Sequence, residues 1–443
     1  MGYSKKYSYL SLGSNFDESN HIVVTFYLES SGDLVKSAEA VAAESSVGTW
    51  TDTEGLTREL FEKYSAKVFM IDKSNKRSGE VKIAYPIELF ETDNIPQLLA
   101  DVAGNVFGMR EIVNLRVKDI IIPEAYVNAN KGPAFGINGI RELLEVYDRP
   151  LLGTIIKPKV GLSTKDHVKI AYEAWVGGVD IVKDDENLTD QDFNPFYDRV
   201  SLTLEARRKA EEETGQKKLY CPNISSRMGE MYARAKFVRE MGGRAAMIDI
   251  ITVGFSGVQF IRDQQIDLIL HGHRAMHAAF THSDLHGISM LVIAKLARLA
   301  GIDQLHTGTV VGKMEGTKEE VTKTNEALRC DWFGAKPTMP IASGGLHPGL
   351  LPDLIKILGN DLIINLGGGI HGHPQGVRSG AVAARQALDS ALKKVQIYEY
   401  AKNHKELKSA LDLWGRGSDG SRRDTSYIHS LVLHKGYHLK KNA

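Results

Sequence analysis

Eight short apolar runs, separated by segments of helical length, occupy the chain between residues 151 and 366 and restrict its fold more than any other feature. Each run has the length and composition of a buried strand, and helical periodicity appears between most of them, for example in 164–177. Eight strands alternating with helices predict a (β/α)8 barrel, an α/β fold. The expected strands are 151–156, 179–183, 218–223, 245–251, 267–271, 304–307, 338–342 and 361–366.

An open, doubly wound sheet is the alternative explanation of this alternation. Such a sheet normally carries one glycine-rich fingerprint directly after its first strand. Here the glycines cluster late, in the triplets SGG (343–345) and GGG (367–369), after the seventh and eighth runs. This placement favours the barrel, in which the loops after strands seven and eight often hold a phosphate.

Residues 1 to about 130 show a different order of predicted strands and helices. Runs rich in β-branched residues are interrupted by two helical segments, 34–44 and 95–105. The order strand, helix, strand, strand, helix, strand predicts an α+β sandwich of the ferredoxin-like kind. We expect this domain over 1–130, the catalytic barrel over 131–415 and a polar tail over 416–443. The four expected strands are 21–29, 66–72, 80–87 and 115–122.

The charge and cysteine content exclude several classes of function. Lys and Arg together number 55, as do Asp and Glu, so the formal net charge is zero. Nucleic acid and anionic membrane surfaces both demand an excess of cations, and we therefore expect neither as a partner. Cys221 and Cys330 are the two cysteines, which excludes a disulfide framework. Without a signal-like or membrane-length apolar run, we expect a soluble, cytoplasmic protein.

The string KDDE (183–186) follows the second expected strand, at the end where barrel enzymes place their active sites. Lys183 and Asp185 share one face of the strand, and Glu186 begins the loop. Alone, such a string is more often a solvated turn, but two carboxylates at a strand end suit Mg²⁺. An ammonium group beside a dication would be repelled, and this conflict disappears if Lys183 is neutral or carries a carbamate.

Phosphate cradles and proton-transfer groups are predicted at the other strand ends. Glycine N–H groups in the two triplets can approach an anion closely, although a single triplet could also be a plain tight turn. Arg274 and Lys313 would supply charge for a second phosphate, with Lys313 in a glycine-rich loop able to close over a ligand. Three histidines could transfer protons, although any one alone is more often structural; they are His271, His273 and His306.

Several long strings, in order along the chain, resemble the large chain of ribulose-1,5-bisphosphate carboxylase/oxygenase (RuBisCO). In the barrel region they are GTIIKPKVGLS (153–163), GGVDIVKDDEN (177–187), LHGHRAMH (270–277), HTGTVVGKMEG (306–316), IASGGLH (341–347) and NLGGG (365–369). Near the N-terminus they are AVAAESSVGTWT (40–51) and AGNVFG (103–108). The resemblance implies a Mg²⁺-dependent carboxylase that adds CO₂ or O₂ to the enediolate of ribulose 1,5-bisphosphate.

The resemblance also implies the roles of individual residues. Lys183 corresponds to the lysine that is carbamylated by a CO₂ molecule other than the substrate. With Asp185 and Glu186 it would bind Mg²⁺. Lys157 corresponds to the base that removes the C3 proton of the substrate.

Further matches concern proton transfer, the mobile loop and the phosphates. Lys159 and His273 correspond to residues that support proton transfer, and Lys313 to the loop lysine that steadies the carboxylate added at C2. Arg274 and His306 correspond to binders of one phosphate. Binders of the other phosphate, together with a hydroxyl near the substrate, correspond to Gly345, Gly367, Gly368 and Ser343.

The resemblance finally implies a shared active site. Four residues correspond to those that complete the site of a neighbouring subunit; they are Glu44, Thr49, Trp50 and Asn105. A homodimer or a higher assembly of dimers is therefore expected. Ile181 replaces the aromatic residue usual in the family's carbamate motif, Ile155 stands where plant enzymes have threonine, and Ile248-Asp249 stands where they have His-Asp. These changes, with the short length, resemble the archaeal form III branch, which works without a small subunit.

Two other functions compete with carboxylation. A RuBisCO-like enolase or isomerase of sulfur salvage would normally lack the loop lysine or the N-terminal residues, all of which are present here. A non-catalytic phosphosugar-binding protein would need the cradles but not Lys157 and the KDDE string. The resemblance leaves open whether the substrate comes from nucleotide (AMP) breakdown or from a phosphoribulokinase.

Overall fold

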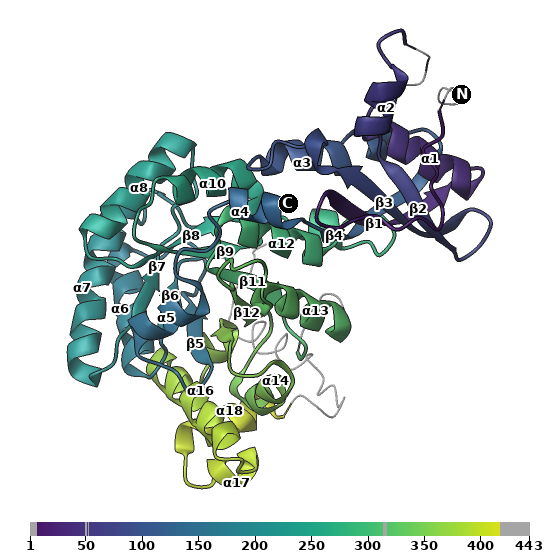
Figure 1. Cartoon of the computed structure of the whole chain (residues 1–443). Coiled ribbons are helices and arrows are strands. Elements are labelled where there is room, and N and C mark those ends of the chain that lie inside the picture. Colours follow the sequence, from purple (N-terminus) through teal and green to yellow (C-terminus); the bar gives the residue numbers. More distant parts are fainter. Residues whose placement is uncertain (1–6, 49–50, 52, 313–316, 417–443) are drawn as a thin grey trace, which may run out of the picture.

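The computed structural model describes residues 7–48, 51, 53–312 and 317–416, and Figure 1 shows an N-terminal domain projecting from one side of a barrel. The predicted residues Thr49, Trp50 and Lys313 lie outside the described residues, as does the tail from 417 onward. Among the described residues, no helix combines the length and the apolar composition needed to cross a membrane.

The N-terminal domain is built on a mixed sheet with the strand order β10-β4-β1-β3-β2. Strands β1 to β4 pair antiparallel, and the order 4-1-3-2 is that of the ferredoxin-like arrangement predicted from the sequence. Helix α2 was not predicted. The elements are β1 (His21–Ser30), α1 (Leu34–Glu44), α2 (Arg58–Tyr64), β2 (Lys67–Lys73), β3 (Ser78–Pro86), the 3-10 turn η1 (Ile87–Leu89), α3 (Ile95–Val102), the 3-10 turn η2 (Asn105–Gly108) and β4 (Ile112–Ile121).

The fifth strand of this sheet comes from the barrel part of the chain. Strand β10 (Gly287–Ile288), from a loop between barrel strands, pairs parallel with β4. The backbone N–H of Ser289 continues the ladder by donating to the carbonyl of Val117 at 2.9 Å. A barrel segment is thus part of the N-terminal sheet, a connection that the sequence did not predict.

The barrel contains eight parallel strands, which confirms the predicted fold class. It closes between β7 and β8 through a parallel bridge from Asn223 to Met247 and two flanking backbone hydrogen bonds. The strands are β5 (Leu151–Ile155), β6 (Ile181–Lys183), β7 (Leu219–Cys221), β8 (Ala245–Asp249), β9 (Ile269–His273), β11 (Gln304–Gly308), β12 (Met339–Ser343) and β13 (Ile363–Leu366). Each lies within or next to one of the eight expected runs.

The barrel interior is a packed apolar core that α5 closes at one end. Alternate strand residues such as Leu151, Ile181 and Met339 point inward and form one cluster with Ile140 and Leu144 of α5 (Gly136–Leu144). Helix α5 packs against residues near the amino ends of the strands. We call this end of the barrel the floor. The opposite, carboxyl ends form the mouth.

The remaining helices cover the barrel or connect its strands (Figure 1). A short helix, α4 (Glu124–Ala129), lies between the N-terminal sheet and α5, and the division of the chain at residue 130 remains a prediction. The others are α6 (Thr164–Val176), α7 (Phe196–Thr214), α8 (Met228–Glu240), α9 (Ile250–Val253), α10 (Phe255–Asp263), α11 (Ala278–Thr281), α12 (Met290–Ala300), α13 (Lys318–Arg329), the 3-10 turn η3 (Pro348–Leu350), α14 (Leu351–Leu358), α15 (Gly368–His371), α16 (Val377–Leu392), α17 (Ile397–Ala401) and α18 (Lys405–Trp414).

Candidate active site

Lys183 is the last residue of β6, and its side chain is buried in the mouth with 1% of the residue exposed. Its Nζ donates a hydrogen bond to the carbonyl of Asp184 at 2.7 Å. Burial lowers the pKa of Lys183, although the carboxylates of Glu186, Asp185 and Asp249 act in the opposite direction. The surroundings therefore favour a neutral amine more than an exposed site would.

Two carboxylates lie beside Lys183, each close to a different basic group. Asp185 Oδ2 lies 2.6 Å from Lys157 Nζ. Glu186 lies 3.6 Å from both Lys159 Nζ and His273 Nε2. Burial alone would raise the pKa of Asp185, but the ion pair with Lys157 outweighs it and the net shift is downward.

The pKa of Glu186 is also lowered, because His273 and Lys183 outweigh the effect of burial. Both carboxylates are therefore ionised at neutral pH. Three β-strand ends, those of β5, β6 and β9, bring these groups together, as expected for the mouth of a barrel.

Asp184 points away from this group, into the packing between β6 and α7. Its carboxylate accepts hydrogen bonds from Tyr220 at 2.7 Å and from Arg199 Nε at 3.1 Å. The backbone N–H of Asn223 donates to it at 3.0 Å. Burial would raise the pKa of Asp184, but Arg199 and His167 hold it well below its usual range. We assign Asp184 a structural role: it fixes the strand end that carries Asp185.

Asp249 at the end of β8 is a member of the site that the sequence analysis missed. Its Oδ1 lies 3.2 Å from His273 Nδ1, and this buried atom has no hydrogen-bond partner within the described part of the chain. The expected fourth strand, 245–251, placed Asp249 inside the strand, whereas β8 ends at Asp249 and so brings it to the mouth.

Histidines line the adjacent part of the mouth and contact one another in a row. His271 Nε2 lies 3.0 Å from His306 Nε2, and His306 Nδ1 lies 2.8 Å from the Ser343 hydroxyl. Gln304 Oε1 lies 2.9 Å from the other ring nitrogen of His271. Burial lowers the pKa of His271 to about 3 and that of His306 well below its usual range. Both rings are therefore neutral at pH 7 and can act as hydrogen-bond partners rather than as cations.

The glycine turn after β12 lies next to Gly312, and the turn after β13 lies next to Lys157. A Cβ on Gly312 would lie 3.3 Å from the carbonyl oxygen of Gly345, and Gly345 itself has φ +65°. A Cβ on Gly367 would lie 3.5 Å from Lys157 Cε. Because glycines lack side chains, a ligand can approach the backbone N–H groups of these turns closely. Gly368 begins the four-residue helix α15.

Arg274 follows β9, on the side of the mouth near β11. A Cβ on Gly308, which has φ +98°, would lie 3.0 Å from an Arg274 guanidinium nitrogen. Arg274 also lines a cavity of about 360 Å³ together with Arg116, Thr307 and Glu320. A guanidinium at a cavity wall is well suited to bind a phosphate.

Glu44 and Asn105 lie in the N-terminal domain rather than at the barrel mouth. Glu44 ends α1 and Asn105 begins η2, and these two elements pack against each other. Helix α1 packs mainly on β1, β2 and β3, at the outer end of the domain (Figure 1). Within one chain, the structure therefore does not bring these two residues to the Lys183 group.

The donor set at Lys183 suits Mg²⁺ only if it gains another oxygen. Within the described ranges, no group of three or more His, Cys, Asp or Glu side chains is arranged to hold a metal ion. Asp185 and Glu186 supply two carboxylates, and hard cations such as Mg²⁺ prefer oxygen ligands. A carbamate on Lys183 would be a third oxygen ligand and would replace a repelling ammonium group.

Comparisons with known proteins agree with this geometry. Residues 10–126 match the ribulose bisphosphate carboxylase large chain, N-terminal domain, and residues 136–414 match its catalytic domain. The ribulose bisphosphate carboxylase of Methanocaldococcus jannaschii is 50% identical over 400 residues, covering 86% of this chain and 94% of the relative.

Solved archaeal structures have the same fold. The octameric Rubisco of Pyrococcus horikoshii in complex with sulfate is 45% identical with a TM-score of 0.88, covering 92% of this chain and 96% of that one. The dimeric Rubisco of Hyperthermus butylicus is 39% identical with a TM-score of 0.86, covering 92% and 99%.

Proposed function

The chain belongs to the family of ribulose bisphosphate carboxylase large chains, and on this premise we propose that it adds CO₂ to ribulose 1,5-bisphosphate and releases two molecules of 3-phosphoglycerate. It is a carbon–carbon lyase in this reaction, and O₂ competes with CO₂ for the same enediolate. One observation carries the proposal: Lys157, Lys183, Asp185, Glu186 and His273 converge at the barrel mouth.

Activation begins at Lys183. The neutral amine attacks CO₂, a C–N bond forms, and one proton leaves to give a negatively charged carbamate. Burial supports this step because it lowers the pKa of the amine and so increases the neutral fraction. The product replaces a buried positive charge by an oxygen ligand.

Mg²⁺ would be held by the carbamate of Lys183 together with Asp185 and Glu186. When bound, it would act as a Lewis acid that polarises the C2 carbonyl oxygen of the substrate. Asp185 is also the ion-pair partner of Lys157, and a cation that shares this carboxylate weakens its hold on the Lys157 ammonium.

The chain's own groups then move protons and bind the phosphates. Lys157 Nζ, as the free amine, takes the proton from C3 of the substrate to give the enediolate. Lys159 and His273 flank Glu186 and support later proton transfers. Lys313, outside the described residues, would stabilise the new carboxylate at C2.

The two phosphates are assigned to two sets of residues at the mouth, which meet where His306 Nδ1 lies 2.8 Å from the Ser343 hydroxyl. Arg274 binds one by charge, and His306 helps by hydrogen bonding, since its ring is neutral. The glycine turns bind the other through their N–H groups, with the Ser343 hydroxyl nearby; these glycines are Gly345, Gly367 and Gly368.

A neighbouring subunit completes the site. Glu44 and Asn105 lie in the N-terminal domain, on α1 and η2, which pack against each other. With Thr49 and Trp50 they would reach the mouth of the partner's barrel. We therefore infer a homodimer or an assembly of dimers without a small subunit, acting in the cytoplasm.

The direct test is fixation of ¹⁴C-bicarbonate into acid-stable product, with ribulose bisphosphate and Mg²⁺. The wild-type chain should fix label and should require preincubation with CO₂ and Mg²⁺ for full activity. Lys183→Ala should lose at least about 10²-fold in rate and should bind Mn²⁺, used as a paramagnetic substitute for Mg²⁺, more weakly.

Lys169→Ala is the matched control, because Lys169 is an exposed lysine on α6. It should behave as wild type in both measurements. Full activity of Lys183→Ala, or activity that does not depend on CO₂ and Mg²⁺ preincubation, would exclude the carbamate model.

A further inference from the structure

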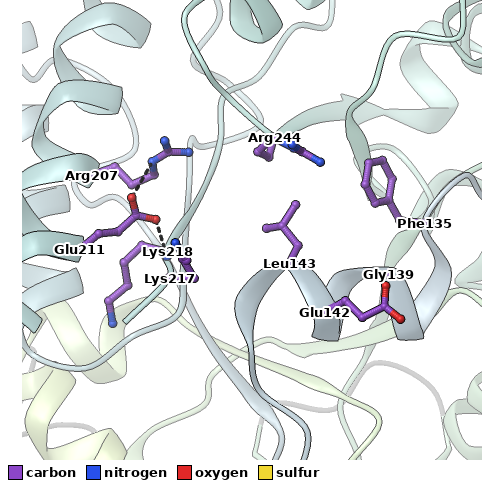
Figure 2. A pocket seen from close by; sticks show the side chains of 9 residues that line it. All are labelled: Phe135, Gly139, Glu142, Leu143, Arg207, Glu211, Lys217, Lys218 and Arg244. Atoms are coloured by element: carbon purple, nitrogen blue, oxygen red, sulfur yellow. Dashed lines mark hydrogen bonds and ion pairs between the residues drawn. The ribbon is translucent and has the colours of Figure 1, made fainter. Parts of the chain in front are cut away.

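A second polar cavity lies at the floor of the barrel, at the opposite end from the mouth. It has a volume of about 510 Å³, within the range of small-molecule sites. Its walls come from α5, α7 and the segments that precede β7 and β8, and we call it the floor cavity (Figure 2). The side chains used below are Phe135, Leu143, Arg207, Glu211, Lys218 and Arg244.

The floor cavity carries an excess of positive charge. Four basic and two acidic residues line it, the basic ones being Arg207, Lys217, Lys218 and Arg244, and the acidic ones Glu142 and Glu211. Both carboxylate oxygens of Glu211 are near chain groups: one accepts from the backbone N–H of Lys218 at 2.9 Å, and the other lies 3.8 Å from Arg207 Nε. An anion would balance the remaining charge.

Arg207 is the unusual residue of this cavity. Its side chain is 10% exposed, and Figure 2 shows it extending from α7 toward the space between α5 and Arg244. Within the described residues, its guanidinium donates no hydrogen bond, and the buried Nε has only the 3.8 Å ion pair with Glu211. Burial lowers the pKa of Arg207; the Glu211 carboxylate acts in the opposite direction, and the charges of Arg208 and Arg244 add to the lowering.

Two buried arginines on the floor side, Arg141 and Arg262, contrast with Arg207. Arg141 donates to the Asp361 carboxylate at 2.8 Å and to three backbone carbonyls. Arg262 donates to the Asp303 carboxylate at 2.6 Å and to the carbonyl of Gly301. A buried guanidinium without hydrogen-bond acceptors costs free energy, and an anionic ligand would remove that cost.

The cavity also offers an apolar wall. Phe135 and Leu143 face it, and the Arg244 guanidinium carbon lies 6.0 Å from the centre of the Phe135 ring. Arg244 is further held by Asp267, whose Oδ2 lies 3.4 Å from its Nη2. The wall would favour a ligand with a flat apolar part beside its charged group.

We propose that the floor cavity binds a small organic phosphate. The phosphate would pair with Arg207 and Arg244, and the apolar part of the ligand would lie against Phe135 and Leu143. The proposed catalytic site lies at the mouth, so this second site neither uses nor requires the catalytic residues.

Phenyl phosphate is a suitable probe, because it combines a phosphate with a flat apolar ring. The full chain is first saturated with ribulose bisphosphate in buffer free of Mg²⁺ and bicarbonate, so that the catalytic site is filled and turnover is prevented. Calorimetric titration should then show one phenyl phosphate per chain. Inorganic phosphate should bind several-fold more weakly, because it makes no contact with the apolar wall.

Two variants and one matched control locate the site. Arg207→Gln and Arg244→Gln should each weaken phenyl phosphate binding at least tenfold, because each removes a charge-assisted hydrogen bond. Arg208→Gln removes the same charge from the exposed side of α7 and should bind as wild type. Because Arg207 is buried, Arg207→Gln could fail to fold. In that case the affinity of Arg244→Gln for phenyl phosphate tests the proposal.

Three results would overturn the proposal. The first is no binding to wild type up to about 10 mM phenyl phosphate. The second is equal binding to the wild type and Arg244→Gln, which would place the ligand elsewhere. The third is equal affinity for inorganic phosphate and phenyl phosphate, which would exclude the apolar contact. No turnover is measured, so these results do not depend on carboxylation; only the filling step depends on the proposed binding of ribulose bisphosphate at the mouth.

Discussion

The mouth and the floor of the barrel both bury charged side chains, but they pair them differently. At the floor, Asp180 accepts two hydrogen bonds from Arg149 at 2.7 and 2.8 Å, a third from Arg385 at 3.1 Å and a fourth from the backbone N–H of Leu152. At the mouth, Glu186 lies 3.6 Å from its two basic neighbours. The carboxylate at the floor is saturated, whereas Glu186 can still accept a ligand.

This contrast separates groups that hold the fold from groups that perform chemistry. A saturated buried ion pair contributes to stability only while it is complete, and its loss leaves uncompensated charge. A loosely paired carboxylate costs little to rearrange and is free to bind a cation. Substitutions at the mouth should therefore change activity more than stability, and those at the floor should do the reverse.

The largest effect is expected for Lys157→Met at the mouth. Removing the general base should lower both ¹⁴CO₂ fixation and wash-out of tritium from C3 of the substrate by about 10²–10⁴-fold. The free energy of unfolding should change little. Lys165→Met, at an exposed position of α6, is the control. Retained tritium wash-out in Lys157→Met would remove this residue from the proton-abstraction step.

Lys313→Ala should separate enolisation of the substrate from the later addition of CO₂. A positioned cation that stabilises developing charge contributes about 10²–10³ in rate, so fixation should fall by that factor. Tritium wash-out from C3 should survive at a substantial fraction of the wild-type rate, because enolisation precedes the step assigned to Lys313. Equal loss of both signals would place the loop lysine at an earlier step.

Asp180→Asn, at the floor, should lower stability rather than activity. It leaves Arg149 and Arg385 without their shared carboxylate, and the free energy of unfolding should fall by about 3 kcal/mol. The kcat of the remaining folded enzyme should stay within about twofold of wild type. Asp361→Asn is the comparison variant: this carboxylate is 51% exposed, so its loss should cost about 1 kcal/mol or less. A large fall in kcat for Asp180→Asn would contradict the separation.

The smallest effect concerns Lys218 at the floor. Burial lowers its pKa to about 8, against 10.5 for a free lysine. Between these values the unfolded chain binds more protons than the folded one, so this residue makes stability rise with pH. Between pH 8 and 9 the wild type should gain about 1 kcal/mol relative to Lys218→Met, measured by urea unfolding at both pH values. A constant difference would show that Lys218 keeps its proton in the folded state.

The parts of the fold that could be predicted are those with a local signal. Each barrel strand is a short apolar run, and the alternation of inward and outward residues follows from strand geometry. Helix α5 was missed because its nine residues are short and because the open barrel end that it covers is not visible locally. Strand β10 has two residues, and its pairing with β4 depends on contacts far apart in the chain.

Some residues of the candidate site could likewise be predicted from the sequence, and others could not. Strand ends and family strings selected Lys183, Asp185 and Glu186, but the sequence could not show that Asp184 is fully engaged by Tyr220 and Arg199. That distinction depends on side chains from β7 and α7. Asp249 was missed because the expected fourth strand ran to residue 251, whereas β8 ends at Asp249. No sequence motif marks Arg207, and its unusual position at the floor follows only from its burial in the structure.

The pairing of β10 with β4 has a consequence for synthesis on the ribosome. Strands β1 to β4 are complete once Ile121 has emerged, yet β10 follows about 170 residues later. At typical translation rates this interval lasts roughly 10 to 30 s. During this time the outer edge of β4 lacks its neighbour and is open to pairing with other nascent chains. We therefore expect chaperones to engage ribosome-bound chains that end between β4 and β10, and to release them once β10 has emerged.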